Sequence, residues 1–346
     1  MSSLEQEARS VTTIRKAEHL QLALDRRHQL DASYFDRWRL PHNALPELSL
    51  EEVDTSLTFL GRRLRAPLLV SCMTGGTPEA AALNRNLATA AQASGVAFGV
   101  GSQRAALEER SLAWTFQVRD VAPDVPLLAN LGAVQLNRGY GLDECRAAVA
   151  MIDADALVLH LNVLQEAIQP EGDTDFRGLL ERIGAVAEGL EVPVIVKEIG
   201  CGISGDVARR LHDAGVRIID AAGLGGTSWA RIEGRRADDE DLGERFADWG
   251  IPTPEAIRAV AAIPGLTVIG SGGVRTGIDV AKTIALGAAL AGMAQPFLAP
   301  ARESAGAVQA RIRRILRELR VAMLCTGAGC LRELAGVDIH QDPGHD

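Results

Sequence analysis

Four polar residues near the middle of the chain have types and spacing suited to chemistry on a phosphorylated ligand. His160 and Asn162 lie two positions apart at the end of an apolar run, and Gln165 and Glu166 follow about one helical turn later. Side chains two positions apart on a strand point to the same side, so His160 and Asn162 can face one pocket. A carboxylate such as Glu166 beside a bound phosphate is a typical Mg²⁺ ligand. Polar residues at a helix start and a structural histidine fit these positions equally well, so the residues alone leave both interpretations open.

Glycine-rich turns further along the chain could hold the phosphate itself. Gly272 and Gly273 follow one apolar run, and Ala294 and Gln295 follow the next. Glycine lets backbone N–H groups approach a phosphate, and the start of the following helix adds a favourable dipole. Ordinary tight turns would have the same composition, but two such turns after neighbouring runs, with Arg275 alongside, favour a phosphate site.

The few lysines of the chain are also informative. Of 36 basic residues, only Lys16, Lys197 and Lys282 are lysines. Lys197 lies within an apolar run, where an amine needs an anionic partner, and an anionic flavin ring is favoured over a neighbouring carboxylate. Lys16 follows Arg15, and this pair forms either a solvated helical turn or a segment that folds over a bound diphosphate. We expect Lys282 on a helix surface.

Eight short apolar runs position these residues. In each run the residues that would point to either face of a strand are mostly apolar, which is typical of strands covered on both faces. Stretches of helical composition lie between them, such as 80–94, 143–152, 176–190 and 205–214. Most spacings fit one strand, one helix and two short loops, the βαβ unit of a parallel sheet. The runs are Leu68–Cys72, Val96–Val100, Pro126–Asn130, Ala156–His160, Val192–Lys197, Val216–Asp220, Leu266–Gly270 and Ala289–Met293.

Eight such units predict an α/β protein with a (β/α)8 TIM barrel, and a doubly wound sheet is the alternative. We expect an N-terminal extension over residues 1–65 and the barrel over 66–346, with a closing helix within 308–334. The charged segment at 232–248 predicts a loop at the barrel mouth. Active sites of such barrels lie at the carboxyl ends of the strands, which is where the polar residues above are found.

Composition excludes several classes of function. With 36 basic and 45 acidic residues the chain has a formal charge of −9, which disfavours binding to nucleic acid or to an anionic membrane. Aromatic residues make up 4%, too few for stacking on single-stranded nucleic acid. The uncharged stretch 283–301 contains Gln295, Pro296 and Pro300, so a helix end and a buried strand are favoured over a membrane span. Five dispersed cysteines and a polar start predict a reduced, cytoplasmic protein.

Taken in order, these segments resemble the type 2, flavin-dependent isopentenyl-diphosphate isomerases. The resemblance runs from about Arg15 to Ala294, and the HLNVLQEAIQPEGD segment is more specific than any glycine loop. The matching segments are RKAEH, MTGGT, GSQRA, NLGAVQL, HLNVLQEAIQPEGD, VIVKEIG, GLGGTSWARIE, GSGGVRTG and GMA.

The resemblance implies conversion of isopentenyl diphosphate to dimethylallyl diphosphate by a 1,3 proton shift. It implies reduced FMN as acid and base, Mg²⁺ on the diphosphate, NAD(P)H to reduce the flavin, and a homo-oligomer, a tetramer or larger. Gln165 would orient or relay a proton, with His160 and Asn162 assisting, and Glu166 would bind the metal. Substrate would contact Arg15, Lys16, Ser102, Gln103, Arg104 and Gln165. FMN would contact Met73, Thr74, Gly75, Ser102, Asn130, Lys197, Thr227, Gly272, Gly273, Arg275, Ala294 and Gln295.

Two other functions remain open from the sequence. An FMN-dependent oxidoreductase of the α-hydroxy acid oxidase or dihydroorotate dehydrogenase type would share the phosphate loops but carry out net hydride transfer. The Gln165-Glu166 pair and the RKAEH segment argue against that alternative. A flavin-binding barrel without catalytic activity is the second alternative, and it would be yellow but inactive.

Overall fold

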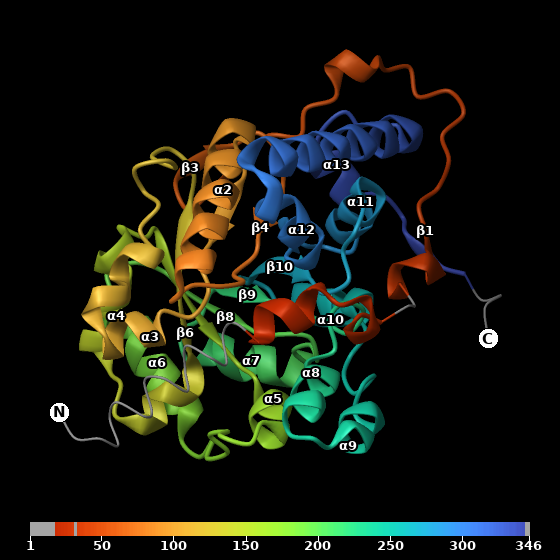
Figure 1. Cartoon of the computed structure of the whole chain (residues 1–346). Coiled ribbons are helices and arrows are strands. Elements are labelled where there is room, and N and C mark those ends of the chain that lie inside the picture. Colours follow the sequence, from red (N-terminus) through yellow and green to blue (C-terminus); the bar gives the residue numbers. More distant parts are fainter. Residues whose placement is uncertain (1–17, 31–32, 343–346) are drawn as a thin grey trace.

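Eight parallel strands close into a barrel at the centre of the molecule (Figure 1). The structure is a computed structural model that describes residues 18–30 and 33–342. Around the barrel the strands follow the order β10-β11-β4-β5-β6-β7-β8-β9. All eight predicted strands are confirmed, and closure between β11 and β4 rules out a doubly wound sheet. The strands are β4 Leu68–Val70, β5 Ala97–Gly99, β6 Leu127–Gly132, β7 Ala156–His160, β8 Val194–Lys197, β9 Ile218–Asp220, β10 Thr267–Ser271 and β11 Leu290–Met293.

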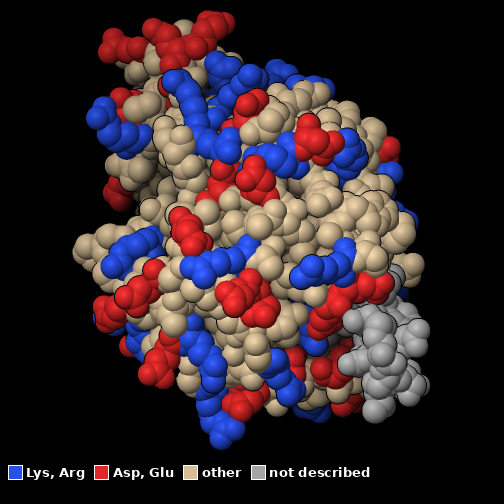
Figure 2. Space-filling model, turned by 90° about the vertical axis from the view of Figure 1, so that its left-hand side faces the viewer, with Lys and Arg blue, Asp and Glu red and all other residues tan. Residues whose placement is uncertain are grey.

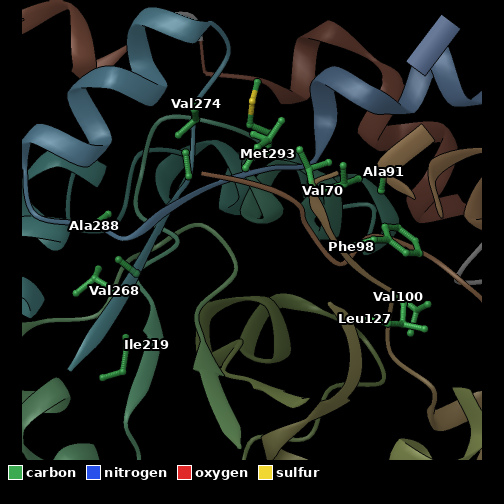
Figure 3. Packing of buried hydrophobic residues seen from close by; sticks show 14 of the residues in the cluster. Val70, Ala91, Phe98, Val100, Leu127, Ile219, Val268, Val274, Ala288 and Met293 are labelled. Carbon is green, nitrogen blue, oxygen red and sulfur yellow. The ribbon is translucent and has the colours of Figure 1, made fainter. Parts of the chain in front are cut away.

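The strands are apolar on both sides because each side meets a separate core. Leu69 belongs to the cluster inside the barrel, whereas Leu68 and Val70 belong to the cluster between the strands and the surrounding helices. Figure 3 shows outward-facing Val70 and Phe98 beside Ala91 in this outer layer. A hairpin of β2 (Leu57–Phe59) and β3 (Arg62–Leu64) contributes to the inner cluster, so the N-terminal extension is part of the packed fold.

Several of the surrounding helices begin at a side chain that caps a free backbone N–H group. In the helix after β4, the Thr77 side chain accepts a hydrogen bond from Ala80 N, and Gly95 ends the helix in the left-handed region. The barrel helices are α2 Pro78–Ser94, α3 Arg104–Glu108, α4 Leu142–Ile152, α5 Val163–Ile168, α6 Leu179–Gly189, α7 Gly205–Asp213, α8 Trp229–Arg236, α9 Glu240–Arg245, α10 Thr253–Ala261, α11 Gly277–Ala285 and α12 Gln295–Glu303. The C-terminal helices are α13 Ala305–Thr326 and α14 Leu331–Ala335.

The charged segment after β9 is helical, so the prediction of a loop over 232–248 was wrong. Ser228 and Asp239 cap the starts of α8 and α9. The two helices meet at Gly234 and Gly243, where an added Cβ on Gly234 would lie 2.7 Å from the Gly243 Cα. The charges that suggested a loop lie mostly on the exposed faces of these short helices. Local composition does not reveal the close contact between Gly234 and Gly243.

Lys282 is buried, so its prediction as a surface residue was wrong. Its side chain is on α11, and its Nζ donates a hydrogen bond of 2.8 Å to the Phe35 carbonyl. Burial lowers the pKa of Lys282, although Asp279 opposes that shift. The N-terminal extension therefore packs against the helix face that bears Lys282. Next to this contact, β1 (Trp38–Arg39) pairs antiparallel with β12 (His340–Gln341).

The apolar stretch 283–301 divides between α11, β11 and α12, as expected from its prolines. Within residues 18–30 and 33–342, no helix has the length and apolarity needed to cross a membrane. On the face shown in Figure 2, basic and acidic side chains are interspersed.

The expected closing helix is present as α13, and its inward face should contribute strongly to stability. Ile312 is fully buried, and α13 packs against α2, α11 and α12. Replacing Ile312 with alanine should lower the free energy of unfolding by about 3 kcal/mol, because it removes buried methyl groups and leaves a cavity. Urea unfolding measures the change. The neighbouring Arg313→Ala, at an exposed position, is the control, and an equal loss in both variants would contradict the packing role of α13.

Candidate active site

A cavity of about 280 Å³ lies at the carboxyl ends of the barrel strands. His19, Leu20 and Ala23, on the N-terminal segment, also line it. The cavity brings together most of the residues predicted from the sequence. They are Met73, Thr74, Gly75, Ser102, Arg104, Asn130, His160, Asn162, Gln165, Glu166, Lys197, Thr227, Gly272, Gly273, Arg275, Ala294 and Gln295.

Three of the predicted residues lie elsewhere or cannot be placed. Gln103 is fully buried outside the cavity lining, and its side chain is directed to α4. Its Nε2 donates to Ala148 O at 2.8 Å, and its Oε1 accepts from Asn130 N at 2.9 Å. This placement does not fit the predicted substrate contact, because both ends of the amide are already used inside the fold. Arg15 and Lys16 lie outside the described residues.

Asn162 links the two residues for which catalytic and metal roles are predicted. Its Nδ2 is 3.1 Å from Gln165 Oε1 and 2.7 Å from Glu166 Oε1. Asn162 immediately precedes α5, so Gln165 and Glu166 occupy the first turn of that helix. All three side chains are at most 9% exposed. Because these side chains are shielded from solvent, the electrostatic interactions among them are stronger than they would be at the surface.

The Glu166 carboxylate is held in place by its own loop. Besides Asn162, Glu166 accepts hydrogen bonds from Gln169 Nε2 at 3.3 Å and from Asp173 N at 2.6 Å. The loop after α5 passes close to the Glu166 backbone at Gly172, where an added Cβ would lie 1.8 Å from the Glu166 carbonyl oxygen. Only glycine permits this approach. The carboxylate is therefore oriented before any ligand binds.

Sequence reasoning missed Glu233, which is fully buried on α8. Gln165 Nε2 donates to Glu233 Oε1 at 2.7 Å, and His19 Nε2 lies 2.8 Å from the same oxygen. Burial raises the pKa of Glu233, but the hydrogen bonds from His19, Gln165 and Arg236 outweigh it and lower that pKa below the usual value. The available signal was its place at the end of the matching segment GLGGTSWARIE, but no role was assigned to it.

His19 is the second residue that was missed. It lies in a helix that includes residues 18–24, and its ring packs edge-on against Trp229 at 5.2 Å between centroids. His19 and Trp229 both line the cavity. The RKAEH segment was recognised for its cations, whereas its histidine is the member found beside Glu233.

Charged and polar side chains also lie at the inner side of the cavity. Lys197 Nζ donates to the Glu198 carbonyl at 2.5 Å and lies 3.8 Å from Asp220 Oδ2. Burial raises the pKa of Asp220, and Lys197 opposes the shift. Lys197 therefore lies near a carboxylate, Asp220, which was the alternative to a flavin ring as its partner. It also lines the cavity, where it can meet a ligand. On the next strands, His160 Nδ1 is 2.9 Å from Asn130 Oδ1.

The glycine turn after β10 packs against the loop after β9. Gly272 and Gly273 have φ of +102° and +70°, and added Cβ atoms would lie 2.0 Å from Gly223 O and 2.4 Å from Gly225 O. Arg275 Nη2 donates to Gly225 O at 3.0 Å, so the arginine ties the two loops together. The start of α12 at Gln295 lines the same part of the cavity. These are the features that a phosphate site at this position needs.

The cavity has polar atoms suited to a flavin phosphate or ring. Ser71 Oγ and Asn162 Oδ1 are buried and have no hydrogen-bond partner among residues 18–30 and 33–342. Buried polar groups are normally satisfied, so these atoms fit a site that receives a polar ligand. The same ranges contain no group of three or more His, Cys, Asp or Glu able to hold a metal ion. A single carboxylate with substrate phosphates is the usual arrangement for Mg²⁺.

A cavity at the carboxyl ends of the strands is typical of barrel enzymes, and the sequence comparison identifies the class. Residues 15–118 and 156–341 match the FMN-dependent dehydrogenase family. The isopentenyl-diphosphate delta-isomerase of Nostoc sp. is 51% identical over 329 residues, covering 93% of this chain and 94% of the relative. That of Stutzerimonas stutzeri is 52% identical over 330 residues, with the same coverage. The chain belongs to the isopentenyl-diphosphate delta-isomerase family.

Solved structures share the fold at much lower sequence identity. A mandelate oxidase variant with an FMN adduct superimposes with a TM-score of 0.63 at 20% identity, covering 94% of this chain and 92% of that chain. This likeness establishes the fold alone. The relatives at about 50% identity favour the isomerase over the oxidase alternative.

Proposed function

We propose that this protein converts isopentenyl diphosphate to dimethylallyl diphosphate by a 1,3 proton shift, with bound FMN and Mg²⁺. The observation that carries the proposal is the buried chain of hydrogen bonds from Glu233 through Gln165 and Asn162 to Glu166, the last three of which line the cavity. It places an oriented amide and an oriented carboxylate side by side, which suits a proton shift on a metal-bound diphosphate ester. The identity to curated isomerases supports the same assignment.

FMN would lie over the strand ends. Reduced FMN, when bound, supplies acid and base chemistry and an electron-rich surface. Lys197 would compensate its negative charge, and the turn at Gly272 and Gly273 with Arg275 would hold its phosphate. The remaining contacts would come from Met73, Thr74, Gly75, Ser102, Asn130, Thr227, Ala294 and Gln295, all in the cavity lining.

The substrate would bind between the flavin site and α5. Glu166 would bind Mg²⁺ together with the diphosphate oxygens, and His160, Ser102 and Arg104 would contact the substrate. Arg104 already pairs with Glu108 at 2.7 Å, so its guanidinium is partly neutralised before ligand binds. The N-terminal extension, residues 1–65, would complete the site, with Arg15 and Lys16 contacting the diphosphate.

Gln165 would act on the proton, and Asn162 would keep it aligned. The Gln165 amide is held at both ends, by Asn162 at its oxygen and by Glu233 at its nitrogen. Such a fixed amide can orient a substrate or relay a proton without reorganising during the reaction. The buried side chains of Asn162, Gln165 and Glu166 would help to exclude water from the reacting carbons.

One anaerobic assay tests the function. Purified protein with FMN, Mg²⁺, NADPH and isopentenyl diphosphate should form dimethylallyl diphosphate without consuming a stoichiometric electron acceptor. A yellow protein that forms no product under these conditions would overturn the proposal. Oxidation of a 2-hydroxy acid with reduction of an acceptor would instead identify an oxidoreductase. We propose further that NAD(P)H serves only to reduce FMN. We also propose that the protein is cytoplasmic and forms a homo-oligomer, a tetramer or larger. Sedimentation would measure the oligomeric state.

A further inference from the structure

Arg236, the last residue of α8, connects three carboxylates from three parts of the chain. Its Nη1 is 2.7 Å from Glu233 Oε2, its Nε is 3.0 Å from Glu18 Oε2, and its Nη2 is 2.7 Å from Glu171 Oε1. The Arg236 side chain is only 10% exposed. The fixed fork of a guanidinium can hold three acceptors in one plane, which an ammonium group cannot do with the same geometry.

Each of the three carboxylates belongs to a different part of the site. The other oxygen of Glu233 accepts a hydrogen bond from Gln165 and lies 2.8 Å from His19 Nε2. Glu18 is in the N-terminal segment next to His19, and Glu171 is in the loop after α5, beside the Gly172 turn that packs on Glu166. One buried guanidinium therefore contacts the N-terminal segment, the loop of Glu166 and the partner of Gln165.

We propose that Arg236 is a positioning residue that couples docking of the N-terminal segment at the barrel mouth to the orientation of Gln165. This inference rests on the proposed function. Arg236 fixes one oxygen of Glu233, which leaves the other directed at Gln165 and His19. The same guanidinium also binds Glu18, which precedes His19 in the N-terminal segment. Arg236 therefore fixes the position of that segment and, through Glu233, the orientation of the Gln165 amide.

Loss of Arg236 should disturb both the docking of the N-terminal segment and the orientation of Gln165. Glu233 is fully buried, and a buried carboxylate without its charged partner is strongly disfavoured. It would bind a proton or rotate, and either change alters its hydrogen bond with Gln165. Glu18 and Glu171 would also lose this cation and repel Glu233. A lysine at position 236 retains the charge but cannot bond to all three carboxylates at once.

The test uses the full-length protein with FMN and three variants. Arg236→Gln removes the charge, Arg236→Lys retains it, and Arg235→Gln is the matched control, because Arg235 is 61% exposed on the same helix and pairs with Glu240. Hydrogen exchange of residues 18–24 should increase about tenfold or more in Arg236→Gln and remain unchanged in Arg235→Gln. Exchange of α2 should be the same in all variants, which distinguishes local release from global destabilisation.

Kinetics supply a second readout that a merely structural role would not change. Arg236→Gln should lower kcat and raise KM, with kcat/KM reduced by about 10²-fold, and Arg236→Lys should recover part of the loss. In a Gln165→Asn background, Arg236→Gln should lower kcat by about twofold at most, because the residue that it positions is already displaced.

Three results would overturn the inference: unchanged exchange of residues 18–24 in Arg236→Gln, an equal effect in Arg235→Gln, or fully additive losses of kcat in the double variant. If Arg236→Gln does not fold, Glu18→Gln removes only the contact to the N-terminal segment, and normal exchange of residues 18–24 in that variant would also contradict the coupling. If wild-type protein forms no dimethylallyl diphosphate, the proposed function fails, while the exchange measurement still decides whether Arg236 holds the segment.

Discussion

Shortening Gln165 to asparagine is expected to lower kcat for isomerisation by about 10³-fold, within the range that a positioned proton-transfer group contributes. Removing one methylene withdraws the amide by about 1.5 Å. That shift breaks the 2.7 Å hydrogen bond to Glu233 or the 3.1 Å hydrogen bond from Asn162. Single-turnover measurements with reduced FMN would separate this loss from slow product release. KM should change much less than kcat, because the variant keeps Glu166 and the phosphate loops.

The control for this prediction is Gln92→Asn, since Gln92 also donates its amide to a carboxylate, Asp124 at 2.8 Å, but is partly exposed on α2 and outside the cavity lining. It should retain activity within about twofold, as expected for a surface substitution. Glu233→Gln should lose about as much kcat as Gln165→Asn, and the double variant should lose little more than either. Normal turnover by Gln165→Asn would remove Gln165 from the mechanism.

Replacing Glu166 with glutamine is expected to reduce kcat/KM by about 10³-fold and to weaken the response to Mg²⁺. The neutral amide keeps the shape of the side chain but gives the metal one anionic oxygen less. It also replaces one carboxylate oxygen by an NH₂ group, which would face the donor of either Asn162, now bonded to Oε1, or Asp173 N, now bonded to Oε2. Mg²⁺ titrations of activity and calorimetric titration of Mg²⁺ into the complex with substrate would measure the two effects.

A matched substitution distinguishes the metal role from a general effect of charge. Glu181→Gln, on an exposed position of α6, removes the same charge far from the cavity lining and should leave Mg²⁺ dependence unchanged. A Glu166→Gln variant with normal activity and normal Mg²⁺ dependence would show that Glu166 only closes its loop. Loss of activity with unaltered Mg²⁺ binding would assign the carboxylate to the substrate instead.

The barrel and the strand-end residues could be predicted because their signals are local. Each strand is an apolar run followed by polar residues or glycine, and parallel strands bring those following residues to one end of the barrel. Asn162, Gln165 and Glu166 meet through contacts within a few residues of each other. The resemblance of the HLNVLQEAIQPEGD segment then added the role of each residue.

Residues whose surroundings depend on distant segments could not be predicted. Gln103 lies between two cavity residues, and its inward turn depends on α4. Lys282 is buried only because the N-terminal extension packs on α11. The pairing of His19 with Glu233 joins an N-terminal helix to α8, which was interpreted as a loop. Periodicity and local composition contain no information on such contacts.

The pairing of early strands with late strands has a consequence for the biosynthesis of the protein. The first barrel strand, β4, pairs with the last, β11, and the extension is tied to the final residues through β1 and β12. A ribosome releases the chain from its N-terminus, so β4 emerges long before its partner and has an open edge during most of translation. Pairing of β1 with β12 comes later still, because it needs residues 340 and 341. The barrel that carries the candidate site and the strand pairing of its N-terminal extension are therefore both completed only after most of the chain has been made.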